Sequence, residues 1–411
     1  MKHGKKIVVG VLSVLVVVAL FFAAQRLVEP KYADDLLEGN FTAEYYEETT
    51  KHDVIMVGDC EVYENIDPMV LWHEYGITSY IRGNAQQLTW QSYYMLEDTL
   101  KYEKPKAVIY NVQALTHGEP QKEEYNRMTL DGMKWSKTKW DAINASMCKG
   151  ENMVDYIFPI LRYHSRITSL TKSDLTHYVT PRHITHNGYY MRVDVLPASE
   201  SDVADPSWLL GDQDTASDTG DEEEEAVDPW DAVDDEVLED DSDASDPWDA
   251  VDQKDESTPK EKETEDGGVE FGDYPMQYLE KMRKLCEKNG IQLILMKAPS
   301  LAPQWYDSEN QQVVDYSNKH DLPYINFYDL LEETGVDFET DTYDGGLHMN
   351  LSGATKLSKY LGKVLSEQYG MKDHRSDASL AKVYDEKYKF HQEMIRKQQK
   401  ELDDYGEIRS Y

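Results

Sequence analysis

The chain has 411 residues and a formal net charge of −37 at pH 7. About 28 acidic residues and about 3 lysines lie between Asp202 and Asp266, so roughly −25 of that charge belongs to one segment. Such a negative field repels phosphate backbones, and no basic patch interleaved with aromatics occurs elsewhere, which argues against nucleic acid as a partner. With 40% hydrophobic residues, the remainder of the chain can bury a sizeable core.

An apolar stretch near the N-terminus, residues 7–24, predicts a membrane helix. About 18 residues are just enough to cross a bilayer. Three lysines precede the stretch, and positive residues stay on the cytoplasmic side, so we expect residues 1–28 to form a cytoplasmic tip and an anchor, with the remainder outside the cytoplasm. A cleaved signal peptide shares these features. Phe22 occupies the first small position of the best cleavage site, which favours the uncleaved anchor.

Composition divides the rest of the chain into five parts. Residues 29–51 are polar and aromatic without a clear period, and we expect a stalk. Residues 52–199 and 271–371 carry short apolar runs and amphipathic stretches of one interrupted domain. Residues 200–270 are rich in Asp, Glu, Ser, Thr and Pro, with too little apolar area to offset ordering entropy, so a disordered acidic insert is expected. Residues 372–411 predict a charged helical tail.

The two halves of the interrupted domain alternate between strand and helix patterns. Short β-branched runs that close on Gly, Asn or Arg predict buried parallel strands, and the stretches between them have apolar residues on one face. The predicted strands are 53–57, 76–81, 106–110, 291–296 and 324–327. The predicted helices are 68–75, 87–101, 278–288, 308–320 and 352–369, with 382–402 in the tail. This order predicts an α/β fold with a central parallel sheet and helices on both faces.

Three cysteines, Cys60, Cys148 and Cys286, are too few for a disulfide framework. Their spacing is not that of a zinc site, and the chain has no nucleotide-binding fingerprint, so we expect neither a metal nor another cofactor. Aromatic and hydrogen-bonding groups suit sugar faces, and on that ground His164 and Arg166 are candidates for a carbohydrate or acceptor groove. A structural role for both is an equal alternative.

Distinctive polar residues follow three of the predicted strands. The first strand leads into Gly58-Asp59-Cys60-Glu61, the second into Gly83-Asn84 and the third into Asn111. A further run, from Asp341 to Asn350, precedes the last helix of the domain and contains Asp344 and His348. Because the carboxyl ends of parallel strands share one edge of a sheet, we expect these groups to gather there.

This set resembles the SGNH (GDSL-like) hydrolases over roughly residues 52–199 and 270–371. The resemblance implies a three-layer α/β/α fold and a catalytic triad of Cys60, His348 and Asp344. It also implies an oxyanion hole formed by the backbone N–H groups of Cys60 and Gly83 and the amide of Asn111. Two residues depart from the family pattern: Cys60 replaces serine, and Asp344 precedes His348 by four positions rather than three. Asp341 is the alternative partner for the histidine.

The anchor and the resemblance together predict a cell-envelope protein. Membrane-anchored members that it resembles take part in alginate O-acetylation and teichoic-acid D-alanylation. We therefore expect an esterase or O-acyltransferase acting on an acylated glycan or polymer, beside a membrane-embedded acyltransferase. A thiolate is a competent acyl acceptor when a base activates it. The alternative is a catalytically inactive SGNH-like accessory subunit, in which Cys60 is a compact buried thiol.

Overall fold

The computed structural model describes residues 2–31, 37–177, 183–200 and 262–410. The strands are β1 (Val54–Gly58), β2 (Ser79–Gly83), β3 (Ala107–Asn111), β4 (Gln292–Lys297) and β5 (Tyr324–Asn326). They form one parallel sheet in the order β2-β1-β3-β4-β5. The expected α/β fold with a parallel sheet is confirmed, and each strand lies within about three residues of its predicted position.

Helices account for most of the remaining described chain. The first half contains α1 (Lys2–Val28), α2 (Phe41–Glu44), α3 (Cys60–Tyr63), α4 (Pro68–Tyr75), α5 (Thr89–Thr99), α6 (Glu123–Leu130), α7 (Lys137–Ser146), α8 (Met153–Ile157), α9 (Ile160–Tyr163) and α10 (Lys172–Thr176). The second half contains α11 (Asp273–Asn289), α12 (Asp307–His320), α13 (Leu331–Thr334), α14 (Leu351–Glu367) and α15 (Ala378–Tyr405).

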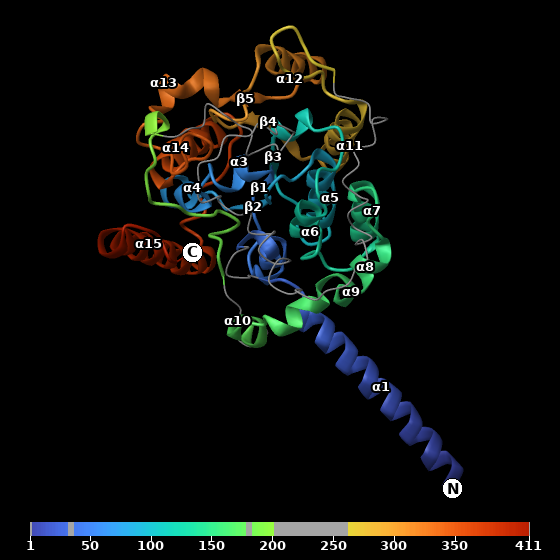
Figure 1. Cartoon of the computed structure of the whole chain (residues 1–411). Helices are drawn as coiled ribbons and strands as arrows, with labels where there is room; N and C mark the ends of the chain where they lie inside the picture. Colours follow the sequence, from blue (N-terminus) through green and yellow to red (C-terminus); the bar gives the residue numbers. More distant parts are fainter. Residues whose placement is uncertain (1, 32–36, 178–182, 201–261, 411) are drawn as a thin grey trace, which may run out of the picture.

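The sheet separates two apolar cores, as the alternation of side chains along a strand requires. In β1, Val54 and Met56 belong to the core beneath α4 and α14, whereas Ile55 and Val57 belong to the core beneath α5 and α11. All four side chains are fully buried. Figure 1 shows the sheet between these two helical layers. The arrangement is compatible with a three-layer α/β/α architecture.

The strand order places a topological switch point between β1 and β3. The chain moves outward from β1 to β2 on one side and from β3 to β4 and β5 on the other. In open parallel sheets with this order, the loops at the carboxyl ends of the two strands beside the switch point separate and leave a crevice. Cys60 follows β1 and Asn111 ends β3, so both residues lie at the switch point, where such a crevice is expected.

Residues 37–51 differ from the expected stalk, because they pack against the domain. Phe41 and Tyr45 are each 4% exposed. The Thr42 hydroxyl donates to the Thr129 carbonyl at 2.9 Å, and the Glu44 carboxylate accepts from the Ile184 N–H at 2.7 Å. The aromatic residues of this segment are therefore core residues, carried on single turns too short to show a sequence period.

The tail helix α15 also belongs to the domain. Its Tyr384 stacks on Trp72 of α4 with ring centroids 4.4 Å apart, and its His391 lies 2.8 Å from Asp67. Most of the expected acidic insert, including both Asp-Pro-Trp repeats, lies outside the described residues. Residues 262–270 are described and pack on α12, where the Glu309 carboxylate accepts from the Val269 N–H at 3.2 Å.

At the opposite end of the chain, α1 is apolar from Lys6 to Val28 and long enough to cross a membrane. In Figure 1 it projects away from the globular domain, and α9 and α10 lie beside its C-terminal end.

Candidate functional site

Cys60 begins helix α3 directly after the turn that ends β1. Two glycines let the neighbouring backbones approach this turn. A Cβ on Gly58 would lie 2.8 Å from the Asn111 Cβ, and a Cβ on Gly83 would lie 3.0 Å from the Gly58 carbonyl oxygen. The Cys60 side chain stays partly exposed although the residues around it are buried. Cys60 is therefore less buried than its neighbours Asp59 and Glu61.

His348 is held by Asp344 through two contacts. Its Nδ1 lies 2.6 Å from one carboxylate oxygen of Asp344, and its backbone N–H donates to the other at 2.8 Å. Gly345 and Gly346, both with positive φ, form the turn that makes a spacing of four residues compatible with this geometry. Asp341, the alternative partner, is fully buried and binds the Asp337 N–H and the Lys356 Nζ. Asp344 is thus the residue that orients the imidazole.

The imidazole of His348 also reaches the thiol of Cys60. Burial raises the pKa of Cys60 to about 11, while the positive charge and hydrogen bond of His348 oppose that rise. Burial alone would lower the pKa of His348, but the carboxylates of Glu64 and Asp344 and the charge of Cys60 raise it well above its ordinary value. Because Nδ1 faces Asp344, Nε2 is the nitrogen available to the thiol. The three residues form a chain of acid, imidazole and thiol.

Glu64 is a second carboxylate at this histidine that sequence reasoning missed. Its Oε2 lies 3.7 Å from His348 Nδ1 and accepts a short hydrogen bond from the Tyr343 hydroxyl. Burial raises the pKa of Glu64 to about 7. The Tyr343 ring stacks near the imidazole, with centroids 6.2 Å apart. Glu64 follows Cys60 by one helical turn, and only that spacing hints at its position.

Asn111 is fully buried beside Cys60, and its amide is engaged by carboxylates. Nδ2 donates to Asp59 Oδ1 and Glu61 Oε2, each at 3.0 Å, and Oδ1 accepts from the Ala298 N–H at 3.1 Å. A carbonyl oxygen bound at Cys60 would compete with Asp59 and Glu61 for this donor. Burial, followed by the charge of Glu61, raises the pKa of Asp59 to about 7. Protonation of Asp59 would weaken one of the two competing interactions.

A buried ion pair between Glu61 and Lys297 stabilises the turn after β1, and no sequence pattern predicted it. Lys297, at the end of β4, is fully buried, and its Nζ lies 2.7 Å from both carboxylate oxygens of Glu61. Its third hydrogen bond goes to the Ala298 carbonyl at 2.8 Å. Because all three ammonium protons are used, Lys297 holds α3 against β4 and has no proton donor left for chemistry.

The two candidate groove residues, His164 and Arg166, belong to a short helix, His164–Thr168, that contacts α1. Arg166 is buried, donating to the Val28 carbonyl at 2.7 Å and to both carboxylate oxygens of Asp174 at 3.1 and 3.2 Å. His164 is exposed and contacts the Leu161 carbonyl at 3.1 Å. The contacts of Arg166 give it a structural role, and those of His164 give it no link to the thiol.

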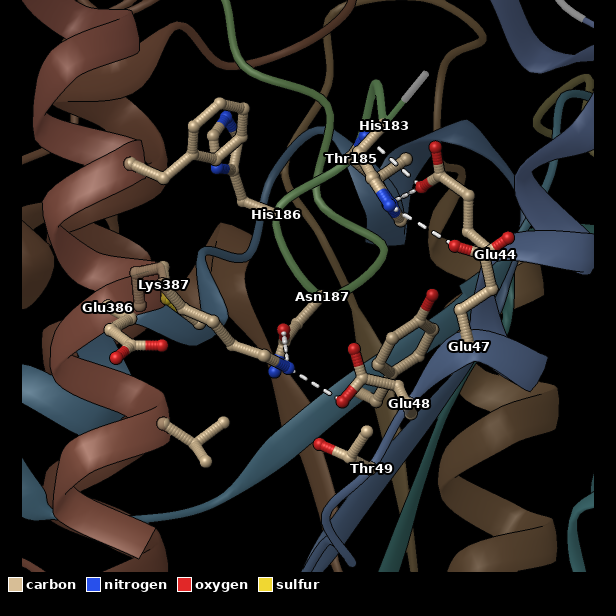
Figure 2. Close-up of a pocket in the computed structure, with 14 residues that line it drawn as sticks. Glu44, Glu47, Glu48, Thr49, His183, Thr185, His186, Asn187, Glu386 and Lys387 are labelled. Atoms are coloured by element: carbon tan, nitrogen blue, oxygen red, sulfur yellow. Dashed lines mark hydrogen bonds and ion pairs between the residues drawn. The ribbon is translucent and has the colours of Figure 1, made fainter. Parts of the chain in front are cut away.

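A cavity of about 400 Å³ lies at another place, between α15 and the segments 44–49 and 183–187. Figure 2 shows Lys387 reaching between Asn187 and Glu48, with distances of 2.7 and 2.6 Å. The Glu44 carboxylate is occupied by the backbone and hydroxyl of Thr185. The lining of the cavity contains no cysteine or serine. Among the described residues, no group of three or more His, Cys, Asp or Glu could hold a metal ion. The cysteine with an adjacent aspartate–histidine pair therefore lies outside this cavity.

Comparison with known proteins supplies no relative. The chain matches no protein-family model and no curated protein. Functional inference therefore rests on the geometry around Cys60 and on the SGNH-like residue pattern.

Proposed function

We propose that the chain is an acyl-transfer enzyme, an esterase or O-acyltransferase, that uses Cys60 as nucleophile, His348 as base and Asp344 as the residue that orients the base. The observation that supports this most is the partly exposed Cys60 at the sheet's switch point, whose thiol pKa responds to an imidazole with Nδ1 2.6 Å from Asp344. Nucleophile, base and orienting carboxylate in series are the recurring arrangement of covalent acyl transfer. The SGNH-like pattern of residues adds support from sequence.

In the first half of the reaction, Nε2 of His348 removes the Cys60 proton as Sγ attacks the acyl carbonyl. Collapse of the tetrahedral intermediate breaks the ester C–O bond and returns the proton to the departing alkoxide, which leaves a thioester on Cys60. In the second half, water or an acceptor hydroxyl gives its proton to His348 and attacks the thioester carbonyl. The C–S bond then breaks, His348 returns the proton to the Cys60 sulfur, and the carboxylic acid or the new ester leaves. Asp344 stabilises the imidazolium that exists between these transfers.

The substrate class follows from location. A chain held at a membrane by α1, with its domain outside the cytoplasm, meets acylated glycans and polymers of the cell envelope. The same location supports a membrane-embedded acyltransferase as its partner. The orientation rests on the three lysines that precede the apolar stretch.

A specific observation favours a second candidate function, that of a catalytically inactive accessory subunit. The pKa of Cys60 is raised to about 11, which keeps the thiol neutral, and both amide hydrogens of Asn111 are donated to carboxylates. In that role the crevice binds an acylated glycan or polymer without reacting with it.

Trapping of an acyl-thioester separates the two functions. The full-length protein in detergent is incubated with an activated acetyl ester, quenched in acid and digested. The active enzyme gives an acetylated peptide containing Cys60, sensitive to hydroxylamine, and Cys60→Ala loses both this peptide and turnover. Cys148→Ala is the matched control, since Cys148 is also free and partly exposed. Turnover that persists in Cys60→Ala would exclude Cys60 as the nucleophile, and an unmodified, inactive parent would favour the accessory subunit.

A further inference from the structure

Four short helices lie beside the C-terminal end of α1, next to the domain, and expose apolar side chains. These are α8, α9, η4 (His164–Thr168) and α10, and we call residues 153–176 the collar. Val154, Leu161, Ile167 and Leu175 are 52%, 53%, 63% and 61% exposed. One exposed apolar side chain needs no explanation, but four large ones within 22 residues, next to a helix that is long and apolar enough to cross a membrane, expose apolar area that water solvates poorly.

The collar is attached firmly to α1. The Gln25 amide donates to the Ile157 carbonyl at 3.3 Å, and Arg166 donates to the Val28 carbonyl at 2.7 Å. Val28 is only 1% exposed and Gln25 6%. The last turn of α1 is therefore part of the folded domain, as expected for a retained anchor and not for a cleaved signal peptide.

The contact between Phe21 and Phe158 sets the depth of the collar. The two rings meet edge to face with centroids 6.0 Å apart. Arg26 is the first charged residue after the apolar stretch, so it marks the outer membrane interface. Phe21 lies five residues earlier, which at about 1.5 Å per residue is roughly 7.5 Å toward the bilayer centre. Interfacial helices bury their apolar faces to a depth of about 5–10 Å.

The charges of the collar suit the same position. Although the chain has 79 acidic residues, neither acid of the collar is exposed: Asp155 is half-buried and Asp174 is buried against Arg166. Lys172 is exposed and suits anionic headgroups.

We propose that the collar inserts into the outer leaflet of the bilayer that α1 spans, with Val154, Leu161, Ile167 and Leu175 in the acyl-headgroup boundary. Two attachments, a spanning helix and an interfacial surface fixed to it, hold the domain against the membrane in one orientation. The inference rests on α1 as an anchor and does not depend on the chemistry of Cys60.

Photo-crosslinking to lipid tests the proposal. The full-length chain carries p-benzoylphenylalanine at position 161, 167 or 175, is reconstituted into phosphatidylcholine and phosphatidylglycerol vesicles, and is irradiated. Position 17, inside α1, reports on the anchor. Position 301 is the matched control, because Leu301 is 44% exposed in the loop after β4, away from the collar. Lipid adducts are then identified by mass spectrometry.

We expect lipid adducts at 17, 161, 167 and 175, at least tenfold above those at 301. Adducts at 17 alone would overturn the insertion of the collar while leaving the anchor intact. The absence of adducts at all positions, 17 included, would overturn the anchor on which the inference rests. Crosslinks from the collar to a second copy of the chain, without lipid, would make this surface a protein interface and overturn the proposal.

Discussion

Two of the aspartate–histidine pairs among the described residues, Asp344–His348 and Asp67–His391, differ in what surrounds them. His348 Nδ1 lies 2.6 Å from Asp344, with side chains 16% and 23% exposed, and it also reaches the Cys60 thiol. His391 Nε2 lies 2.8 Å from Asp67, with side chains 2% and 0% exposed, and its Nδ1 has no hydrogen-bond partner. The pair alone is therefore no sign of catalysis. Access to solvent and a neighbouring nucleophile make the difference.

The largest expected difference between the two pairs is in activity. His348→Ala removes the base that we propose for Cys60, so we expect acyl-ester turnover to fall about 10³-fold or more, in the range that a general base contributes. His391→Ala leaves the crevice intact, and turnover per folded molecule should change less than about threefold. Initial rates with an activated acetyl ester, at a temperature where circular dichroism shows both variants folded, check this. Equal losses in the two variants would remove the functional distinction.

The free energy of unfolding should show the reverse order, with the larger loss at the Asp67–His391 pair. Asp67 caps α4 by accepting from the Met69 N–H at 2.7 Å, and it is the only hydrogen-bond partner of His391 among the described residues. Asp67→Ala removes a cap and one member of a buried pair, which together cost about 3–5 kcal/mol of unfolding free energy. Asp344→Ala, at a partly exposed pair, should cost about 1 kcal/mol or less. Urea unfolding in detergent compares them, and a more costly Asp344→Ala would contradict the assignment.

The sequence pointed to the Asp344–His348 pair and not to the buried Asp67–His391 pair, for physical reasons. β-branched runs closed by glycine mark β1 and β2, and a similar run that ends at Asn111 marks β3. Because the strands are parallel, Cys60 after β1 and Asn111 at the end of β3 lie at the same edge of the sheet. Glu64 and the Glu61–Lys297 pair could not be predicted in the same way. Lys297 pairs with a residue 236 positions away, and a buried charge has no periodic sequence signal. Single helical turns, as in the collar and in residues 37–51, are too short to reveal which face is buried.

Glu64 offers a smaller effect that is specific to the Cys60 side of the comparison. Its negative charge raises the pKa of both Cys60 and His348. The pKa of Glu64 itself is about 7, so the residue is a carboxylate at the alkaline pH where the thiol titrates. The charge of Glu64 is the largest of those that raise the pKa of His348 and a smaller one at Cys60, so its main effect on the thiol passes through the imidazolium. Glu64→Gln should therefore weaken the imidazolium beside the thiol and raise the apparent pKa of the thiol, by about one unit. The rate of iodoacetamide labelling at Cys60 against pH measures it.

Exposed Glu332, on α13, is the control for that experiment. Glu332→Gln removes the same charge from the chain without a contact at His348, and the labelling profile should stay where it is in the parent. A Glu64→Gln profile that coincides with the parent would show that Glu64 acts through packing and not through its charge.

The smallest predicted effect uses the opposite pH dependence of the two pairs. The pKa of Asp67 is lowered, because the charge of His391 and the Met69 N–H outweigh burial. Its contribution to stability is therefore present above the unfolded-state pKa of about 3.8 and is lost as the pH falls through the lower folded-state pKa. The pKa of His348 is raised, so its contribution is fully present below about 6.5 and is lost as the pH rises through the folded value. The difference in unfolding free energy between the parent and His348→Gln should therefore narrow as the pH is raised from 6 toward 10, by about 1 kcal/mol because His348 is partly exposed. Urea titrations at a series of pH values measure this difference. A difference that grows with pH would mean that the native state favours neutral His348, so that the carboxylates of Glu64 and Asp344 do not stabilise its charged form.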